Sequence, residues 1–141
     1  MIQRDYFLRM IEEATQVLAT LMGLTGKGEF DQAQTLLEKS YNGYFKFSRD
    51  QLMYTEEPDL IKWLTEEREL IDEQLSLLAD FLWRDGQWHY AQSEREKGDR
   101  LLKKGIVILK YLQTKQTTLY SFERVNKIAL MEEALKGSEG V

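Results

Sequence analysis

The sequence predicts an all-α protein of about five helices packed as antiparallel hairpins, and three observations lead to this prediction. Apolar residues in every long segment recur at the spacing of a helix that is buried along one side. No run rich in Val, Ile and Thr alternates with polar residues between turn signals, as it would in a strand. The 141 residues are 43% apolar, which is enough for one buried core and argues against a disordered chain.

The first two helices are predicted over residues 3–22 and 29–47, joined by a turn that is rich in glycine. Gly23 stands where a glycine ends many helices, and Gly43 lowers helix stability enough to favour a break near it. The apolar stripe of the first helix consists of Tyr6, Met10, Ala14, Val17, Leu18 and Leu21. The stripe of the second consists of Phe30, Ala33, Leu37, Tyr41 and Tyr44.

A third helix is predicted from Pro58 to about Arg84, after a polar connection over residues 48–57. Proline suits the first turn of a helix because the N–H that it lacks would have no partner there. Apolar pairs recur every seven residues along this helix, at Trp63/Leu64, Leu70/Ile71 and Leu77/Leu78. Asp85-Gly86 is expected to close the helix.

The fourth helix is predicted over residues 87–112. It places Gly98 and Gly105 on its core-facing side, where two glycines would let a neighbouring helix approach closely. A break at one of the two glycines is the alternative.

The last helix is predicted to begin between Thr118 and Ser121, either of which can cap it, and to end at Lys136 before a glycine. We expect a single all-helical domain over residues 1–137 and a frayed tail over residues 138–141.

The scarcity of cysteine and histidine excludes several kinds of site. The chain has no Cys, so disulfides, thiolate nucleophiles and cysteine-ligated metal centres are excluded. His89 is its only histidine, which excludes zinc and di-iron sites that need two imidazoles. We predict no cofactor, no metal site and no catalytic residue. His89 is expected at a turn or helix cap, since no Gly-x-Ser-x-Gly turn presents a serine to it.

The charge pattern favours a soluble cytoplasmic protein with no membrane partner. Charged residues interrupt the first ten positions, and nowhere do about 18 uncharged apolar residues run together. Residues 1–90 carry 9 basic and 17 acidic side chains, a formal charge of −8, whereas residues 91–141 carry 10 and 7, a charge of +3. The two charges add to the −5 of the whole chain.

A basic stretch without acidic residues follows residue 99. It contains Arg100, Lys103, Lys104, Lys110 and Lys115. Nucleic acid is one partner for such a stretch, but the acidic charge elsewhere in the chain opposes it. A solvated helix face that balances an acidic neighbour is the favoured interpretation.

A short pattern occurs twice in the chain, with an offset of 58 residues. Gly28-Glu29-Phe30-Asp31-Gln32-Ala33 is echoed by Gly86-Gln87-Trp88-His89-Tyr90-Ala91, a Gly-x-aromatic-x-x-Ala pattern. It resembles the hairpin turn of the tetratricopeptide repeat (TPR), and the resemblance covers about residues 14–45 and 72–103. The repeat of that family has a period of about 34 residues, so the resemblance implies TPR-like hairpins rather than a tandem array.

The first twelve residues carry a second resemblance. Asp5-Tyr6-Phe7-Leu8-Arg9-Met10-Ile11 is similar to the Asp-Tyr-x-x-Arg-x-Ile opening of a family of small bacterial helical proteins of unknown function. This resemblance implies a bacterial helical protein and brings no activity with it.

The aromatic residues indicate the most informative functional hypothesis. A small helical domain has few places to bury 16 large rings, so some are expected at a groove or a dimer face. The candidates for this interaction surface are Tyr41, Tyr44 and Trp63. The leading hypothesis is a non-enzymatic interaction module for a protein, a peptide or a second copy of the chain. The alternatives are a small enzyme or ligand-binding protein that uses carboxylates and His89 in a bundle cavity, and weak nucleic-acid binding through residues 100–115.

Overall fold

The fold is all-α, as predicted, in a computed structural model that describes residues 2–115 and 122–139. These residues form seven α-helices and two π-helical segments, and they contain no strand. The order of elements is α1 (Ile2–Gly26), α2 (Phe30–Ser40), η1 (Tyr41–Phe45), α3 (Arg49–Tyr54), α4 (Glu57–Lys62), η2 (Trp63–Glu67), α5 (Asp72–Ala91), α6 (Arg95–Thr114) and α7 (Phe122–Glu139). The expectation of about five helices was therefore too low.

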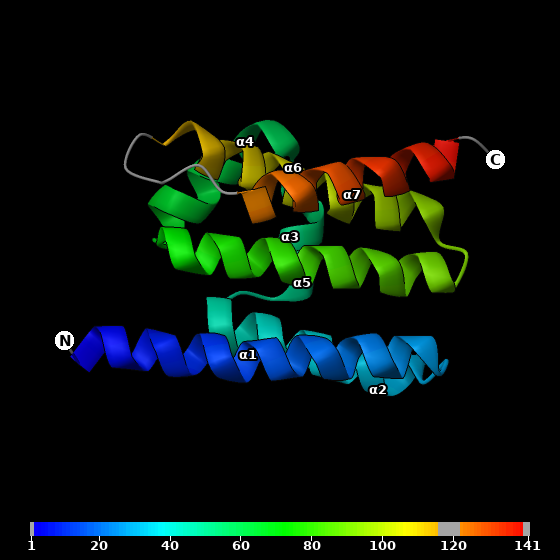
Figure 1. The fold of residues 1–141 in the computed structure, drawn as a ribbon, viewed down its shortest axis with the longest axis horizontal. Helices are drawn as coiled ribbons and strands as arrows, with labels where there is room; N and C mark the ends of the chain where they lie inside the picture. The colour runs from blue at the N-terminus through cyan, green and yellow to red at the C-terminus, as the bar shows by residue number, and fades with distance from the viewer. Residues whose placement is uncertain (1, 116–121, 140–141) are drawn as a thin grey trace.

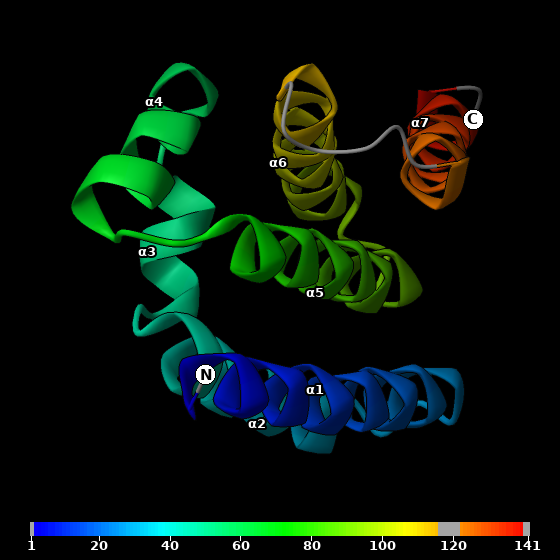
Figure 2. The same cartoon turned by 60° about the vertical axis from the view of Figure 1, so that its left-hand side comes forward.

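The helices stack in layers, with α5 at the centre. Helices α1 and α2 lie antiparallel in the lower layer, α5 lies above them, and α6 lies above α5 with α7 at its side (Figure 1). In the turned view, α3 and α4 form a column at one end of the molecule that leads from the α1–α2 layer up to the level of α6 (Figure 2). Every one of these helices, judged over the described residues, is too short or too polar to cross a lipid bilayer.

The turn between α1 and α2 lies later in the chain than predicted. Helix α1 continues through Gly23 to Gly26, so the predicted end at Gly23 is wrong. The chain leaves the helix at Gly28, which has a φ of 76°. Its N–H bonds to the carbonyl of Thr25, and the N–H of Glu29 bonds to the carbonyl of Leu24. These two bonds form a Schellman motif, which needs a left-handed residue where Gly28 stands.

The turn between α5 and α6 has the same geometry. Ser93 is left-handed with a φ of 63°, its N–H bonds to the carbonyl of Tyr90, and the N–H of Glu94 bonds to the carbonyl of His89. The equivalent turns are therefore 65 residues apart, from Gly28 to Ser93.

The predicted turn at Asp85-Gly86 is wrong, because Gly86 lies inside α5. A Cβ atom at Gly86 would lie 2.0 Å from Cδ1 of Leu102 and 3.2 Å from the carbonyl oxygen of Gly98. The glycine therefore permits close packing of α5 on α6 rather than a turn. The predicted fourth helix over residues 87–112 is replaced by α6, which begins at Arg95.

The predicted helix from Pro58 to Arg84 is also wrong, since the chain breaks between η2 and α5. Glu69 takes a left-handed φ of 55°, which a continuous helix does not contain. Leu70 turns into the core while its neighbour Ile71 is left exposed.

The last helix extends beyond its predicted end at Lys136. Helix α7 runs to Glu139 and so includes part of the segment that was expected to fray. Its predicted caps, Thr118 and Ser121, lie outside the described residues.

Helix α3 is an element that the sequence analysis missed. Ser48 accepts a hydrogen bond from the backbone N–H of Gln51, and the side chain of Gln51 accepts one from the N–H of Ser48. This reciprocal pair is a capping box, which starts a helix inside the segment expected to be a polar connection. Its consequence for function is that Arg49, the first residue of α3, is held over α5.

Candidate functional site

A polar groove lies where α2 and α3 approach the turn between α5 and α6. It has a volume of about 370 Å³. The side chains that line it are Gln34, Glu38, Asn42, Ser48, Arg49, Asp50, Met53, Tyr54, Trp88, His89, Glu94 and Lys97. Several titratable groups converge here, which is a common property of binding and catalytic sites.

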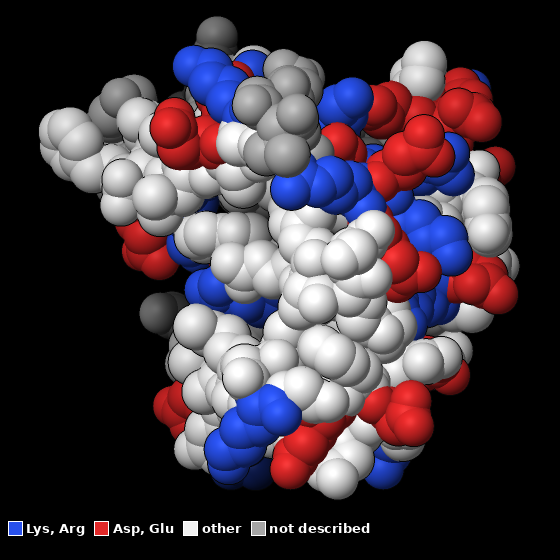
Figure 3. All heavy atoms as spheres, turned by 90° about the vertical axis from the view of Figure 1, so that its right-hand side faces the viewer, with Lys and Arg blue, Asp and Glu red and all other residues white. Residues whose placement is uncertain are grey.

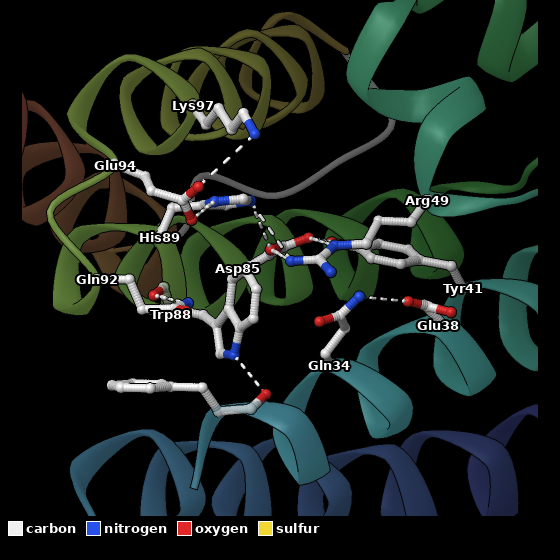
Figure 4. Close-up of polar contacts among 11 residues, drawn as sticks. Gln34, Glu38, Tyr41, Arg49, Asp85, Trp88, His89, Gln92, Glu94 and Lys97 are labelled. Atoms are coloured by element: carbon white, nitrogen blue, oxygen red, sulfur yellow. Dashed lines mark hydrogen bonds and ion pairs between the residues drawn. The ribbon is translucent and has the colours of Figure 1, made fainter. Parts of the chain in front are cut away.

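Asp85 lies beneath the groove and holds its parts together (Figure 4). The carboxylate is completely buried, with an exposed fraction of 0%. Arg49 donates to it twice, from Nε to Oδ2 at 3.0 Å and from Nη2 to Oδ1 at 2.5 Å. The hydroxyl of Tyr41 donates to Oδ2 at 2.8 Å. A buried carboxylate is stable only when it is paired and hydrogen-bonded in this way.

The pKa values of the two donors reflect this pairing. Burial raises the pKa of the Tyr41 hydroxyl well above its usual value, and the neighbouring Asp85 carboxylate raises it further. Burial disfavours the Arg49 cation, but the hydrogen bonds and attraction from Asp85 outweigh that effect and raise its pKa. Tyr41 is therefore a neutral donor and Arg49 a permanent cation at this site.

His89 joins this ion pair to the turn between α5 and α6. Its Nδ1 lies 3.0 Å from Oε1 of Glu94, and its Nε2 lies 3.4 Å from Nη2 of Arg49 and 3.5 Å from Oδ1 of Asp85. Burial lowers the pKa of His89, despite the opposing attraction of Asp85 and the hydrogen bond to Glu94. We therefore assign a neutral imidazole that donates from Nδ1 to Glu94 and accepts at Nε2 from Arg49.

His89 lies in the last turn of α5, next to the turn that leads into α6. The predicted fourth helix over residues 87–112 would have placed it at the beginning of a helix instead. Its carbonyl accepts the turn-closing bonds from Gln92 and Glu94, while its ring forms part of the groove. In return, the hydrogen bond from His89 lowers the pKa of Glu94.

Trp88 forms the wall of the groove between α5 and α2. Its indole N–H donates to the carbonyl oxygen of Phe30 at 3.0 Å. The guanidinium carbon of Arg49 lies 4.5 Å from the centre of the Trp88 ring, which is the geometry of a cation–π contact. Arg49 is thus fixed both by Asp85 and by Trp88, and only 12% of its side chain is exposed.

The rim of the groove is polar and accessible. Gln34 donates to Glu38 at 3.0 Å along α2, and Lys97 lies 3.6 Å from Glu94. Tyr54 is 67% exposed. Positive and negative side chains are interleaved over the end of the molecule that carries the two hairpin turns (Figure 3).

The three predicted interaction residues do not share one surface. Tyr41 is completely buried among Phe45, Phe47 and Phe81, and its hydroxyl bonds to Asp85. Tyr44 lines a second cavity of about 630 Å³ along α1, where its hydroxyl donates to Glu13 at 2.9 Å and its pKa is raised to about 12, chiefly by burial. Trp63 is half-buried against Phe47, with ring centres 5.0 Å apart. Tyr41 therefore cannot contact a partner, and neither Tyr44 nor Trp63 lines the polar groove.

The basic stretch does not present all its charges to solvent. Lys104 is buried, and its ammonium donates to the carbonyl oxygen of Thr55 at the end of α3. Lys110 lies 3.8 Å from Glu132, and Lys115 lies 2.7 Å from Asp72. These contacts weaken the case for nucleic-acid binding through this helix.

Asp85 and Arg49 are functional candidates that the sequence analysis missed. One signal was available, because Leu78, Leu82, Asp85 and His89 follow one another at helical spacing and all four are buried. Two polar residues that continue an apolar stripe indicate a buried polar network. The role of Arg49 had no such signal, since its partner lies 36 residues away in the chain.

Over the part of the chain that the structure describes, no group of three or more His, Cys, Asp or Glu side chains is arranged to hold a metal ion. Comparisons with known proteins do not supply a function. No family model matches the sequence, and comparisons with curated proteins and with solved structures give no match either.

Proposed function

We propose that the protein is a non-enzymatic binding module and that the groove over Asp85 receives a segment of a partner protein or a peptide. The observation that carries this proposal is the rigid floor of the groove. Asp85, Arg49, Tyr41 and His89 bond to one another and join α3, η1 and α5. A site whose side chains are already fixed loses little conformational entropy when a ligand binds.

The state of the titratable groups also favours binding over chemistry. Asp85 is committed to Arg49 and Tyr41, and both nitrogens of His89 have partners. A general base needs a free lone pair within reach of the proton that it removes. The exposed side chains on the rim instead offer hydrogen-bond donors and acceptors to a ligand.

A paired substitution on α2 tests the proposal. Gln34 lines the groove, whereas Gln32 is exposed on the same helix outside it. Gln34→Trp should fill the groove and Gln32→Trp should not. We expect short peptides of mixed sequence to shift the NMR signal of the Trp88 indole N–H in the wild type and in Gln32→Trp, and to leave it unchanged in Gln34→Trp. Peptides that move no groove signal in the wild type would contradict the proposal.

Self-association is a related proposal. If a second copy is the partner, the sedimentation coefficient should rise with protein concentration, and Gln34→Trp should suppress the rise.

We also propose a cytoplasmic location, a bacterial origin and TPR-like packing. The two hairpins α1–α2 and α5–α6, closed by equivalent turns, support the proposal of TPR-like packing.

One observation favours a second candidate, a small-ligand site or enzyme that uses carboxylates and His89. The imidazole does lie between two carboxylates at an accessible groove. This candidate requires a small molecule to displace Arg49 or Glu94 from the imidazole. Binding of such a molecule would raise or lower the pKa of His89 in an NMR titration, whereas a peptide bound at the rim would leave it unchanged.

A further inference from the structure

We infer that the occupant of the groove is a positively charged peptide segment, held through an Arg or Lys side chain by Glu38 and Asp50. The inference rests on the proposed function and adds the chemistry of the partner. It comes from the balance of charges around the groove, the placement of the carboxylates and the aromatic residue at the rim.

The charges that line the groove are unequal. Three carboxylates, Glu38, Asp50 and Glu94, face two cations, Arg49 and Lys97. Arg49 is already neutralised by Asp85 beneath it, at 2.5 Å.

The remaining charges leave a negative excess. Lys97 is the neighbour of Glu94, at 3.6 Å, and His89 contributes no charge because burial keeps it neutral. Glu38 attracts Arg49 electrostatically, but Arg49 is bonded to Asp85, and neither Glu38 nor Asp50 forms an ion pair with a residue that lines the groove. With Asp85 included, four carboxylates therefore face two cations. A concave site with such an excess attracts ligands of the opposite charge.

The two carboxylates come from different helices. Glu38 lies on α2 and Asp50 in the first turn of α3, and both side chains are exposed. Glu38 accepts a hydrogen bond from Gln34, which fixes one of its oxygens and leaves the other available. A divalent cation prefers six or more oxygen ligands gathered at one point. Two carboxylates on separate helices suit the spread donors of a guanidinium or an ammonium on a flexible stem better.

The aromatic residues at the groove suit the same ligand. Tyr54, with 67% of its surface exposed, offers a ring at the rim. A guanidinium already packs on an aromatic ring in this site, since Arg49 lies 4.5 Å from the Trp88 centroid. Cations bind aromatic faces by the same electrostatic attraction when they come from a ligand.

The inference is tested with three peptides of equal length that differ at the central positions, which carry Arg, the uncharged isostere citrulline, or Glu. We expect the Arg peptide to bind, with an affinity that falls as salt is added, and the citrulline and Glu peptides to bind at least about tenfold more weakly. The double variant Glu38→Gln/Asp50→Asn should lose about tenfold in affinity for the Arg peptide. Glu133→Gln on α7 changes an exposed charge away from the groove and is the control that should bind as the wild type does.

The outcomes separate this inference from the proposed function. The inference would be overturned if the citrulline peptide bound as tightly as the Arg peptide, or if Glu38→Gln/Asp50→Asn left the affinity for the Arg peptide unchanged. In either case, a peptide that still shifts the Trp88 indole signal would leave the proposed function standing. Free arginine that binds as tightly as the peptide would assign the site to a small cation and would also overturn it. If none of the peptides moves a groove signal, both the inference and the proposed function fail.

Discussion

Asp85 is the residue on which the site depends most. It is an acid with no exposure to solvent, and its charge is tolerated because Arg49 and Tyr41 donate to it. Removing one partner of a buried pair leaves the other charge buried without compensation. An ion pair at the surface contributes little to the free energy of unfolding, because water and salt screen the charges.

We predict that Asp85→Ala lowers the free energy of unfolding by about 3–5 kcal/mol, as measured by urea denaturation. Asp80→Ala is the control, since Asp80 forms a partly exposed pair with Lys127 at 2.9 Å, and it should cost less than about 1 kcal/mol. Arg49→Met/Asp85→Leu removes both buried charges and should recover much of the loss. Equal losses for Asp85→Ala and Asp80→Ala would contradict this account.

His89 should make stability depend on pH. Its pKa is lowered in the folded protein, so the unfolded chain binds the proton more tightly. The neutral His89 therefore contributes fully to the free energy of unfolding above the pKa of an unfolded histidine, about 6.5. This contribution is lost as the pH falls below that value. We predict that the wild type loses stability as the pH falls below about 6.5 and that His89→Asn, which keeps a donor near Glu94, loses less. Urea denaturation at several pH values measures the difference, and identical pH profiles would refute the prediction.

At the scale of elements, the glycines of the hairpins act in two different ways. In α6, a Cβ atom at Gly98 would lie 2.6 Å from Cε1 of Tyr90 and 3.0 Å from the carbonyl oxygen of Gly86. In α1, a Cβ atom at Gly23 would have nothing within 4 Å. The first glycine permits close packing, and the second only weakens its helix.

These two glycines make a matched pair of substitutions. Gly98→Ala should lower the free energy of unfolding by about 1–3 kcal/mol, because the added methyl group forces α5 and α6 apart. Gly23→Ala should raise it by up to about 1 kcal/mol, because alanine is the better helix former. Thermal or urea denaturation of the two variants gives the answer, and a gain in stability for Gly98→Ala would disprove the packing role.

The same two cases show what could be predicted about the elements. Helical spacing of apolar residues correctly predicted that the elements are helices, because each helix buries one face. Their ends were misplaced, because a glycine can end a helix but can also lie inside one. Gly23 lies inside α1 with free space around it, and Gly86 lies inside α5, where it permits close packing. Helix α3 does have a local signal in the sequence, because Ser48 and Gln51 stand at the spacing of a capping box.

At the scale of the whole molecule, the α1–α2 hairpin packs against the α5–α6 hairpin through α5. Helix α5 contacts α1 and α2 below it and α6 above it. The acidic first part of the chain and the basic last part meet in this assembly, for example where Lys115 reaches Asp72 and Lys127 reaches Asp80. The asymmetry of charge along the sequence is thus partly neutralised within one molecule.

The sequence could not predict the groove, because the groove has no local pattern. Its parts come from α2, α3, α5 and α6, and each part is ordinary for the helix that carries it. Composition alone excludes sites that need a cysteine or two histidines. The contact of His89 with Arg49, in contrast, follows only from the packing of the helices.

The contacts that build the floor of the groove also give it a place in the order of folding. Trp88 bonds to Phe30 across 58 residues of chain, and Tyr41 bonds to Asp85 across 44. Contacts of such long range form after the local ones, because more chain entropy must be lost to close them. A chain that has formed its two hairpins but has not yet docked them has no groove, so an intermediate of this kind cannot engage a partner at this site. Occupation of the groove would then report that folding is complete, and a bound partner would hold the two hairpins together.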